Sequence, residues 1–351
     1  MKIVAPAQTL LLHGVPASPY TRKMLALLRY RRIPYRLLQA SSTPLGMPAA
    51  KVPLLPTFYT PGADGNLEAM TDSTPLIRRF EAEFPERHVI PKDPALALID
   101  ALIEDYADEW LTKAMFHFRW AHTQDFEKAA AILPSFADLL LDDERHDSLG
   151  KWISTRQHSR LRYVGSNSTT AAVIESSYER FLDALEEHLQ RFPFLLGHRP
   201  GAGDFAVYGQ LSQLALFDPT PMTIAVRRAP RVVAWTMLME DQSGLEPEPS
   251  HWLSSDSIAA GTVPSLIRLL REIGRVYPAL LLANASALQE GAAHVAATID
   301  DKPWVQNTFP YQCKCLLWLQ RDFDALDEAE RHQVRQMITG TGCEALFKGA
   351  G

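Results

Sequence analysis

Apolar and polar residues alternate over short stretches in the first 86 residues, and in two segments apolar residues recur at helical spacing instead. This pattern predicts a strand over 10–13, a helix over 19–31, strands over 35–38, 53–59 and 67–70, and a helix that begins at 71–75. Asp64-Gly65-Asn66 is typical of a hairpin turn between the last two strands. The elements therefore run β-α-β and then β-β-α, which predicts an α+β domain with a parallel strand pair and an antiparallel hairpin.

Helical periodicity dominates the rest of the chain, after a linker rich in proline and charge at 85–94. Helices are expected over 95–122, 171–190 and 204–216 and from Pro230, whereas the polar residues 143–168 are expected to be irregular. Further helices are expected around 263–277, 283–298, 311–324 and 328–338. We therefore expect three parts: the α+β domain at 1–86, an all-helical domain at 87–250, and a helical C-terminal extension at 251–351 that packs on the helical domain.

Size and composition agree with this division. A chain of 351 residues suits two domains, or two and an extension, and 46% hydrophobic with 22% charged residues is ordinary for a globular protein. The formal net charge of −6 argues against a nucleic-acid partner, and no apolar run is long enough to span a membrane. Met1 to Ala7 lacks the apolar core of a signal peptide, and three cysteines are too few for a disulfide framework. We expect a soluble protein in a reducing, cytoplasmic compartment.

The most informative local signal is Ser18-Pro19-Tyr20, which follows the first predicted strand. Ser18 is a favourable N-cap, and Pro19 suits the first position of a helix. A helix that begins there directs backbone N–H groups and the positive end of its dipole at one point, where a thiolate or another anion is stabilised. From the residues alone two interpretations of Ser18 stay open: a helix cap, or a cap that also contacts an anion.

Four segments in this order resemble the glutathione transferase superfamily. They are Ser18-Pro19-Tyr20, Lys51-Val52-Pro53, Asp72-Ser73, and the stretch from Leu195-Leu196-Gly197 to Gly203-Asp204-Phe205-Ala206. The resemblance covers roughly residues 8–242 and implies a thioredoxin-like first domain, an all-helical second domain and a homodimer. One departure is Gly201, which stands where the family usually has Ser or Thr as the cap of a buried helix.

The resemblance implies that glutathione is the co-substrate and that the protein activates its thiol. Ser18 would donate a hydrogen bond to the glutathione thiolate, and Tyr20 is a second possible donor. For Tyr20 the alternative is an aromatic ring packed on the loop. The thiolate would then attack a small hydrophobic electrophile held by the helical domain. No cysteine stands at position 18, so thiol–disulfide chemistry is not supported.

The resemblance also assigns the rest of glutathione to two segments. Val52 would offer its backbone to the cysteinyl part, because it precedes Pro53, which the resemblance implies to be cis. Asp72 would bind the γ-glutamyl ammonium, and Ser73 would bind the γ-glutamyl carboxylate at a helix N-terminus. The structural alternatives are a trans Pro53 at the start of a strand and a plain helix cap at Asp72-Ser73.

The basic residues of the first helix and its exit either form a solvated face or steer an anionic tripeptide; they are Arg22, Lys23, Arg29, Arg31, Arg32 and Arg36. Cys313-x-Cys315 lacks the spacing of metal ligands, so we expect no metal. Two functions stay open: a glutathione transferase-like enzyme, or a non-catalytic binding or scaffold protein that keeps the fold, which the C-terminal extension would suit.

Overall fold

The computed structural model describes residues 9–38, 46–62 and 65–347. Met1 to Ala7 and Asp64, which belong to the signal-peptide and hairpin predictions, lie outside the described residues. The N-terminal part contains β1 (Leu10–His13), α1 (Pro19–Tyr30), β2 (Tyr35–Leu38), β3 (Thr57–Pro61), β4 (Leu67–Met70) and α2 (Ser73–Glu83). Its sheet has the order β2-β1-β3-β4: β1 pairs parallel with β2 and antiparallel with β3, and β3 pairs antiparallel with β4. The predicted fold class is confirmed.

The middle of the chain is helical. It contains α3 (Pro94–Tyr106), the π-helical segment η2 (Ala107–Leu111), α4 (Thr112–Ala121), α5 (Thr123–Ala137), α6 (Asp143–His158), α7 (Leu161–Val164), α8 (Ala171–His188), α9 (Ala202–Leu214), α10 (Pro219–Arg228) and α11 (Pro230–Leu238). The prediction that 143–168 is irregular is wrong, because α6 and α7 lie there. Helix α6 gave no apolar signal because the residues it buries, Gly150 and Ser154, are small and neither has an apolar side chain.

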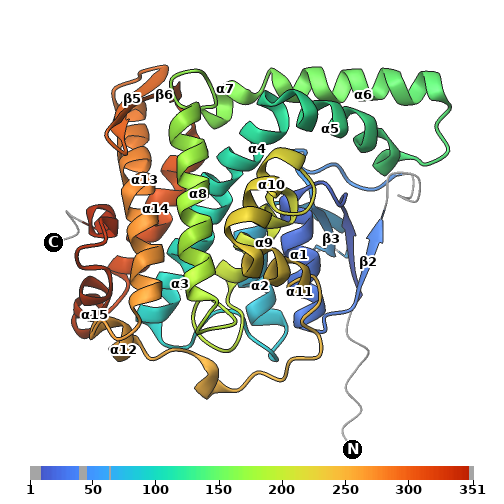
Figure 1. The fold of residues 1–351 in the computed structure, drawn as a ribbon. Coiled ribbons are helices and arrows are strands. Elements are labelled where there is room, and N and C mark those ends of the chain that lie inside the picture. The colour runs from blue at the N-terminus through green and yellow to red at the C-terminus, as the bar shows by residue number, and fades with distance from the viewer. Residues whose placement is uncertain (1–8, 39–45, 63–64, 348–351) are drawn as a thin grey trace, which may run out of the picture.

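The C-terminal segment, residues 251–351, combines helices with a hairpin. It contains α12 (Ser255–Ala259), α13 (Pro264–Gln289), β5 (His294–Ile299), β6 (Lys302–Asn307), α14 (Pro310–Asp324), α15 (Glu328–Ile338) and the 3-10 turn η4 (Cys343–Phe347); the 3-10 turn η3 (Pro249–His251) precedes it. The prediction of a helix over 283–298 is wrong: α13 continues through Pro278, and residues 294–299 form β5, antiparallel to β6. In Figure 1 α13 lies beside α8, and α14 and α15 contact α3. Among the described residues no helix is long and apolar enough to cross a membrane.

Helix α9 determines where α1 lies. All of α9 is buried, and α1 packs along it (Figure 1). A Cβ at Gly209 would lie 2.6 Å from the Pro19 carbonyl oxygen, so a larger residue there would push the first turn of α1 away. The N-terminus of α1 is therefore fixed against the helical part of the chain.

A carboxylate from another helix caps α9. Asp100 of α3 accepts hydrogen bonds from the backbone N–H groups of Ala202 and Gly203, both at 3.0 Å. A Cβ at Gly201 would lie 2.4 Å from Asp100 Oδ1, so a side chain at this position would displace the carboxylate. Asp204 also accepts from the Gly201 N–H at 2.9 Å, and burial raises the pKa of Asp204 to about 7. The departure at Gly201 thus has a physical reason: the missing side chain makes room for Asp100.

Candidate functional site

Ser18 lies at the N-terminus of α1, as the sequence predicts. Its Oγ accepts a hydrogen bond from the Thr21 N–H at 3.2 Å, so Ser18 caps the helix. Its hydroxyl donates to the Leu55 carbonyl oxygen at 3.4 Å, which is long for an O–H···O hydrogen bond. The side chain is half-buried, and its proton is weakly held. Capping the helix and donating to another acceptor are therefore compatible.

The prediction of a cis peptide bond before Pro53 is wrong. The cis bond lies between Leu55 and Pro56. Strand β3 begins directly after Pro56, later than the predicted start at residue 53, so Pro56 is the proline at the entrance of the strand. Val52 is 49% exposed. The residue of this loop that contacts the N-terminus of α1 is therefore Leu55, and not Val52.

Asp72 and Ser73 form the N-terminus of α2, and each of them forms a hydrogen bond with a side chain from another helix. Asp72 has φ 80°, in the left-handed region that is costly for a residue other than glycine, and its side chain does not cap α2. Its carboxylate accepts a hydrogen bond from the Tyr311 hydroxyl at 2.8 Å, and Lys314 Nζ lies 4.0 Å from the same oxygen. Ser73 is buried, and its hydroxyl accepts from Lys23 Nζ at 3.1 Å. Helix α14 of the C-terminal segment therefore contacts the candidate site directly.

Lys23 is the centre of a buried charged cluster. Its Nζ lies 2.7 Å from Glu104 Oε1 and 2.6 Å from Asp108 Oδ2. The interpretation of the basic residues as a solvated face is wrong for Lys23 and for Arg31, since both are buried. Burial alone lowers the pKa of the Lys23 amine, but the two carboxylates outweigh it and hold that pKa above its ordinary value. Burial also raises the pKa of Asp108 to about 7 against the opposing attraction of Lys23.

The hydroxyl of Tyr20 is directed at the helical part of the chain. It donates to the Asp108 carbonyl oxygen at 2.7 Å and lies 3.4 Å from Thr112 Oγ1. Burial, together with Glu109 and Asp108, raises the pKa of Tyr20 well above its ordinary value. The phenol therefore keeps its proton and ties α1 to η2. A catalytic role for Tyr20 stays a prediction.

Acidic side chains are buried along the helix that faces this site. They are Asp100, Glu104, Asp108 and Glu109, and Asp105 beside them is half-buried. Burial is the main reason why the pKa of Asp105 rises to about 6 and that of Glu109 to about 8. Burial alone would also raise the pKa of Glu104, but the charge of Lys23 lowers it below its ordinary value. Ionised and protonated carboxyl groups therefore lie close together in this helix at neutral pH.

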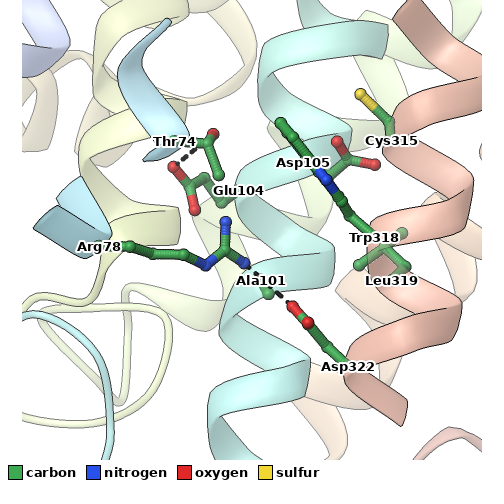
Figure 2. Close-up of a pocket in the computed structure, with 9 residues that line it drawn as sticks. All are labelled: Thr74, Arg78, Ala101, Glu104, Asp105, Cys315, Trp318, Leu319 and Asp322. Carbon is green, nitrogen blue, oxygen red and sulfur yellow. Dashed lines mark hydrogen bonds and ion pairs between the residues drawn. The ribbon is translucent and has the colours of Figure 1, made fainter. Parts of the chain in front are cut away.

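Figure 2 shows a small cavity between α2, α3 and α14, next to these acids. Thr74 donates to Glu104 Oε1 at 3.0 Å on one side, and Arg78 bonds to Asp322 at 3.2 Å on the other. The cavity volume is about 10 Å³, which is about the space that one water molecule needs. This cavity cannot hold a tripeptide, so we place the candidate site at Ser18, Asp72 and Ser73 instead.

Sequence reasoning missed several of these residues for different reasons. Lys23 carried a usable signal, because it lies four and seven residues before the buried Leu27 and Tyr30, on the same face of α1. Tyr311 carried none, because nothing local shows that α14 contacts α2. The cluster of potential metal ligands formed by His117, His122 and Glu175 was also missed, because Glu175 is far from the two histidines in the sequence.

Family models match two separate parts of the chain. Residues 12–88 match the glutathione S-transferase N-terminal domain, and residues 166–236 match the glutathione S-transferase C-terminal domain. Both matched parts of the chain belong to the glutathione transferase superfamily. The first match spans the mixed sheet with α1 and α2, and the second spans α8, α9 and α10. Helices α3 to α6 and the C-terminal segment lie outside both glutathione transferase matches.

Solved structures of glutathione transferases are similar to the chain at low sequence identity. One from Burkholderia graminis, with two glutathione molecules bound per subunit, has 16% identity and a TM-score of 0.41, covering 68% of this chain and 90% of that chain. A Tau class enzyme from mango has 16% identity and a TM-score of 0.40, covering 70% and 96%. A family member from Pseudomonas fluorescens with two glutathione bound has 15% identity and a TM-score of 0.37, covering 68% and 95%. No curated protein matches the chain. Sequence identities and TM-scores this low do not indicate which reaction the chain performs.

Proposed function

We propose that this member of the superfamily is an enzyme that activates the thiol of glutathione for attack on a small hydrophobic electrophile. A free thiol has a pKa of about 8.5, so little thiolate is present at neutral pH. A hydroxyl donor and a helix N-terminus both stabilise the thiolate and lower that pKa. The observation that carries the proposal is the Ser18 hydroxyl, which caps α1 while its proton is held only by a 3.4 Å contact with Leu55.

The remaining contacts that we propose for glutathione come from Leu55, Asp72 and Ser73. The Leu55 backbone lies beside the Ser18 hydroxyl, where the cysteinyl part would run. A carboxylate can accept several hydrogen bonds, so Asp72 can receive the γ-glutamyl ammonium while Tyr311 donates to Oδ2. Ser73 begins α2, and the backbone N–H groups of that helix start suit the γ-glutamyl carboxylate.

The Ser18→Ala variant tests the proposed mechanism. Loss of the donor should raise the pKa of the bound thiol by about one unit, which lowers the thiolate fraction and kcat/KM about tenfold at pH 6.5. The KM for glutathione should change less than twofold, because the contacts at Asp72 and Ser73 are retained. The measurements are turnover of an activated aryl halide and the pH dependence of thiolate absorbance in the binary complex.

Ser18→Thr is the matched control, since threonine keeps both the hydroxyl and the capping function. Assays belong well below the unfolding temperature, because loss of an N-cap costs about 1 kcal/mol of stability. Turnover that is unchanged in Ser18→Ala would remove Ser18 from the mechanism.

The C-terminal segment favours a second candidate function, a binding or scaffold protein that keeps the fold without turnover. Tyr311 and Lys314 both contact Asp72, the residue that we assign to the ammonium of glutathione. Thermal unfolding with and without glutathione, beside the turnover assay, separates the two. A ligand at 100 times its Kd adds about 2.7 kcal/mol of stability. Stabilisation without turnover supports the binding protein, turnover supports the enzyme, and the absence of both contradicts both.

We further propose a cytoplasmic location and a homodimer. The three cysteines are free, which is usual in a reducing compartment. Light scattering at twice the mass of the chain is expected for the homodimer, and a single-chain mass contradicts it. We also propose that the chain is divided into an α+β domain at 1–86, an all-helical domain at 87–250 and a C-terminal extension at 251–351.

A further inference from the structure

Three potential metal ligands converge between α4 and α8, outside the residues proposed for glutathione. His117 Nε2 lies 3.0 Å from Glu175 Oε1, and His122 Nε2 lies 3.2 Å from the same oxygen. The ligand atoms of all three residues lie within 4.8 Å of one another. Two imidazoles and one carboxylate are the donor set of many zinc sites in which water occupies the fourth position.

These separations match the geometry that a zinc ion requires. Zinc bonds to histidine nitrogen and carboxylate oxygen at about 2.0–2.1 Å in a tetrahedral arrangement, which places neighbouring ligand atoms about 3.3 Å apart. The 3.0 Å and 3.2 Å contacts of His117 and His122 with Glu175 are close to that value. The three ligand atoms all lie within 4.8 Å of one another, so rotation of the partly exposed His122 and Glu175 side chains would bring them around one cation.

The orientation of His117 is fixed by a contact at its other ring nitrogen. Nδ1 lies 2.7 Å from the Ser166 hydroxyl, and both residues are buried. Coordination uses the lone pair of Nε2, so the ring proton of His117 belongs on Nδ1, where Ser166 Oγ accepts it. Such a hydrogen bond on the far nitrogen is typical of metal-binding histidines, because it selects the tautomer and holds the ring in place.

His122 is held by packing on an aromatic ring. Its imidazole stacks on buried Phe118 with ring centroids 5.2 Å apart and an angle of 25° between the planes. His122 follows the last residue of α4 and has an extended backbone, φ −99° and ψ 130°, which lets its ring approach that of His117. The ligands are therefore positioned by the fold and not by each other alone.

The cluster is closed on one side and open on the other. The side chain of His117 is 5% exposed, whereas those of His122 and Glu175 are 31% and 39% exposed. A cation bound here would have a solvent-facing position for a water ligand. One carboxylate and two neutral imidazoles would leave a net charge of +1 on the site.

We propose that His117, His122 and Glu175 bind a Zn²⁺ ion with water as the fourth ligand. The ion joins the turn between α4 and α5 to α8, so its role is to fasten the α5–α6 helical pair to α8 within the helical domain. The expectation of no metal concerned Cys313 and Cys315 and the residues near them in the sequence, whereas the proposed ligands lie on α4, after α4 and on α8.

Zinc binding by tag-free protein that has been treated with a chelator tests the proposal. Equilibrium dialysis against Zn²⁺ should give one ion per chain. His122→Ala and Glu175→Gln change half-buried side chains at the open side of the cluster, and each should weaken the binding at least tenfold. His332→Ala is the matched control, because His332 is an exposed histidine of α15 outside the cluster. Zn²⁺ should raise the unfolding temperature of the wild type and of the control, but not of the two ligand variants.

Two results would overturn the zinc site. One is no binding by the wild type at a tenfold excess of Zn²⁺ over protein, and the other is binding that both ligand variants retain at full strength. Neither measurement uses glutathione, so the outcome is independent of the function proposed above.

Discussion

Lys23→Met removes the positive charge from a site where two carboxylates depend on it. The Lys23 side chain is 1% exposed, and its Nζ contacts Glu104 at 2.7 Å and Asp108 at 2.6 Å. Methionine has a similar length and fills the space, so the change acts mainly on charge. The hydrogen bond from Nζ to Ser73 Oγ at 3.1 Å is lost as well.

The expected loss of stability is about 3–5 kcal/mol at pH 8, because removal of one partner leaves a buried charge uncompensated. Folded proteins have about 5–15 kcal/mol of stability in all, so this single change removes a large fraction. The measurement is urea unfolding followed by circular dichroism. Lys51→Met serves as the control, because Lys51 is exposed, and it should change stability by less than about 0.5 kcal/mol.

The pH dependence gives the sharper test. Burial already raises the pKa of Asp108 to about 7 with Lys23 present, and without the amine this pKa rises further. The pKa of Glu104, which the charge of Lys23 holds below its ordinary value, rises as well. A carboxyl whose pKa is raised by folding contributes its full stability at a pH below its pKa in the unfolded chain, which is near 4. That contribution is lost as the pH rises through its pKa in the folded protein. The deficit of Lys23→Met relative to wild type should therefore be smaller at pH 5 than at pH 8. A deficit below about 1 kcal/mol at pH 8, or one that is equal at both pH values, would refute this reasoning.

Two further variants test other contacts. Gly201→Ala should lower the free energy of unfolding by about 1–3 kcal/mol, since a Cβ lies 2.4 Å from Asp100 Oδ1, whereas Gly244→Ala, with nothing within 4 Å, should be nearly neutral in the same urea assay. Tyr20→Phe should cost about 1 kcal/mol of stability for its lost 2.7 Å hydrogen bond, with turnover unchanged. A fall in turnover as large as that of Ser18→Ala would instead give Tyr20 a catalytic role.

Local signals were sufficient to predict the N-terminal fold. Alternation, helical spacing and turn residues predicted β1, α1, β2, β4 and α2 close to their observed bounds. Ser18 was predicted correctly as a cap because an N-cap depends on residues within one turn. The start of β3 was misplaced because two prolines, Pro53 and Pro56, stand close together and the pattern does not tell which one enters the strand.

The rest of the candidate site depends on contacts that span much of the chain. Lys23 meets Glu104 and Asp108, 81 and 85 residues further on, and no window of sequence shows that these charges share one buried position. A charged residue on a helix is usually exposed, so a solvated face was the ordinary interpretation of Lys23. That interpretation failed because the carboxylates that pair with Lys23 are buried beside it. The β5–β6 hairpin was missed because a second helix was expected over 283–298, whereas α13 runs from Pro264 to Gln289 and β5 begins at His294.

The hydrogen bond between Tyr311 and Asp72 joins residues that are 239 positions apart. During synthesis at about 5–20 residues per second, roughly 10–50 s pass between the appearance of the two residues. The sheet with α1 and α2 can form within that interval, while the Asp72 carboxylate has neither Tyr311 nor Lys314 beside it. The nascent chain therefore presents this end of the candidate site uncovered until α14, made much later, covers it.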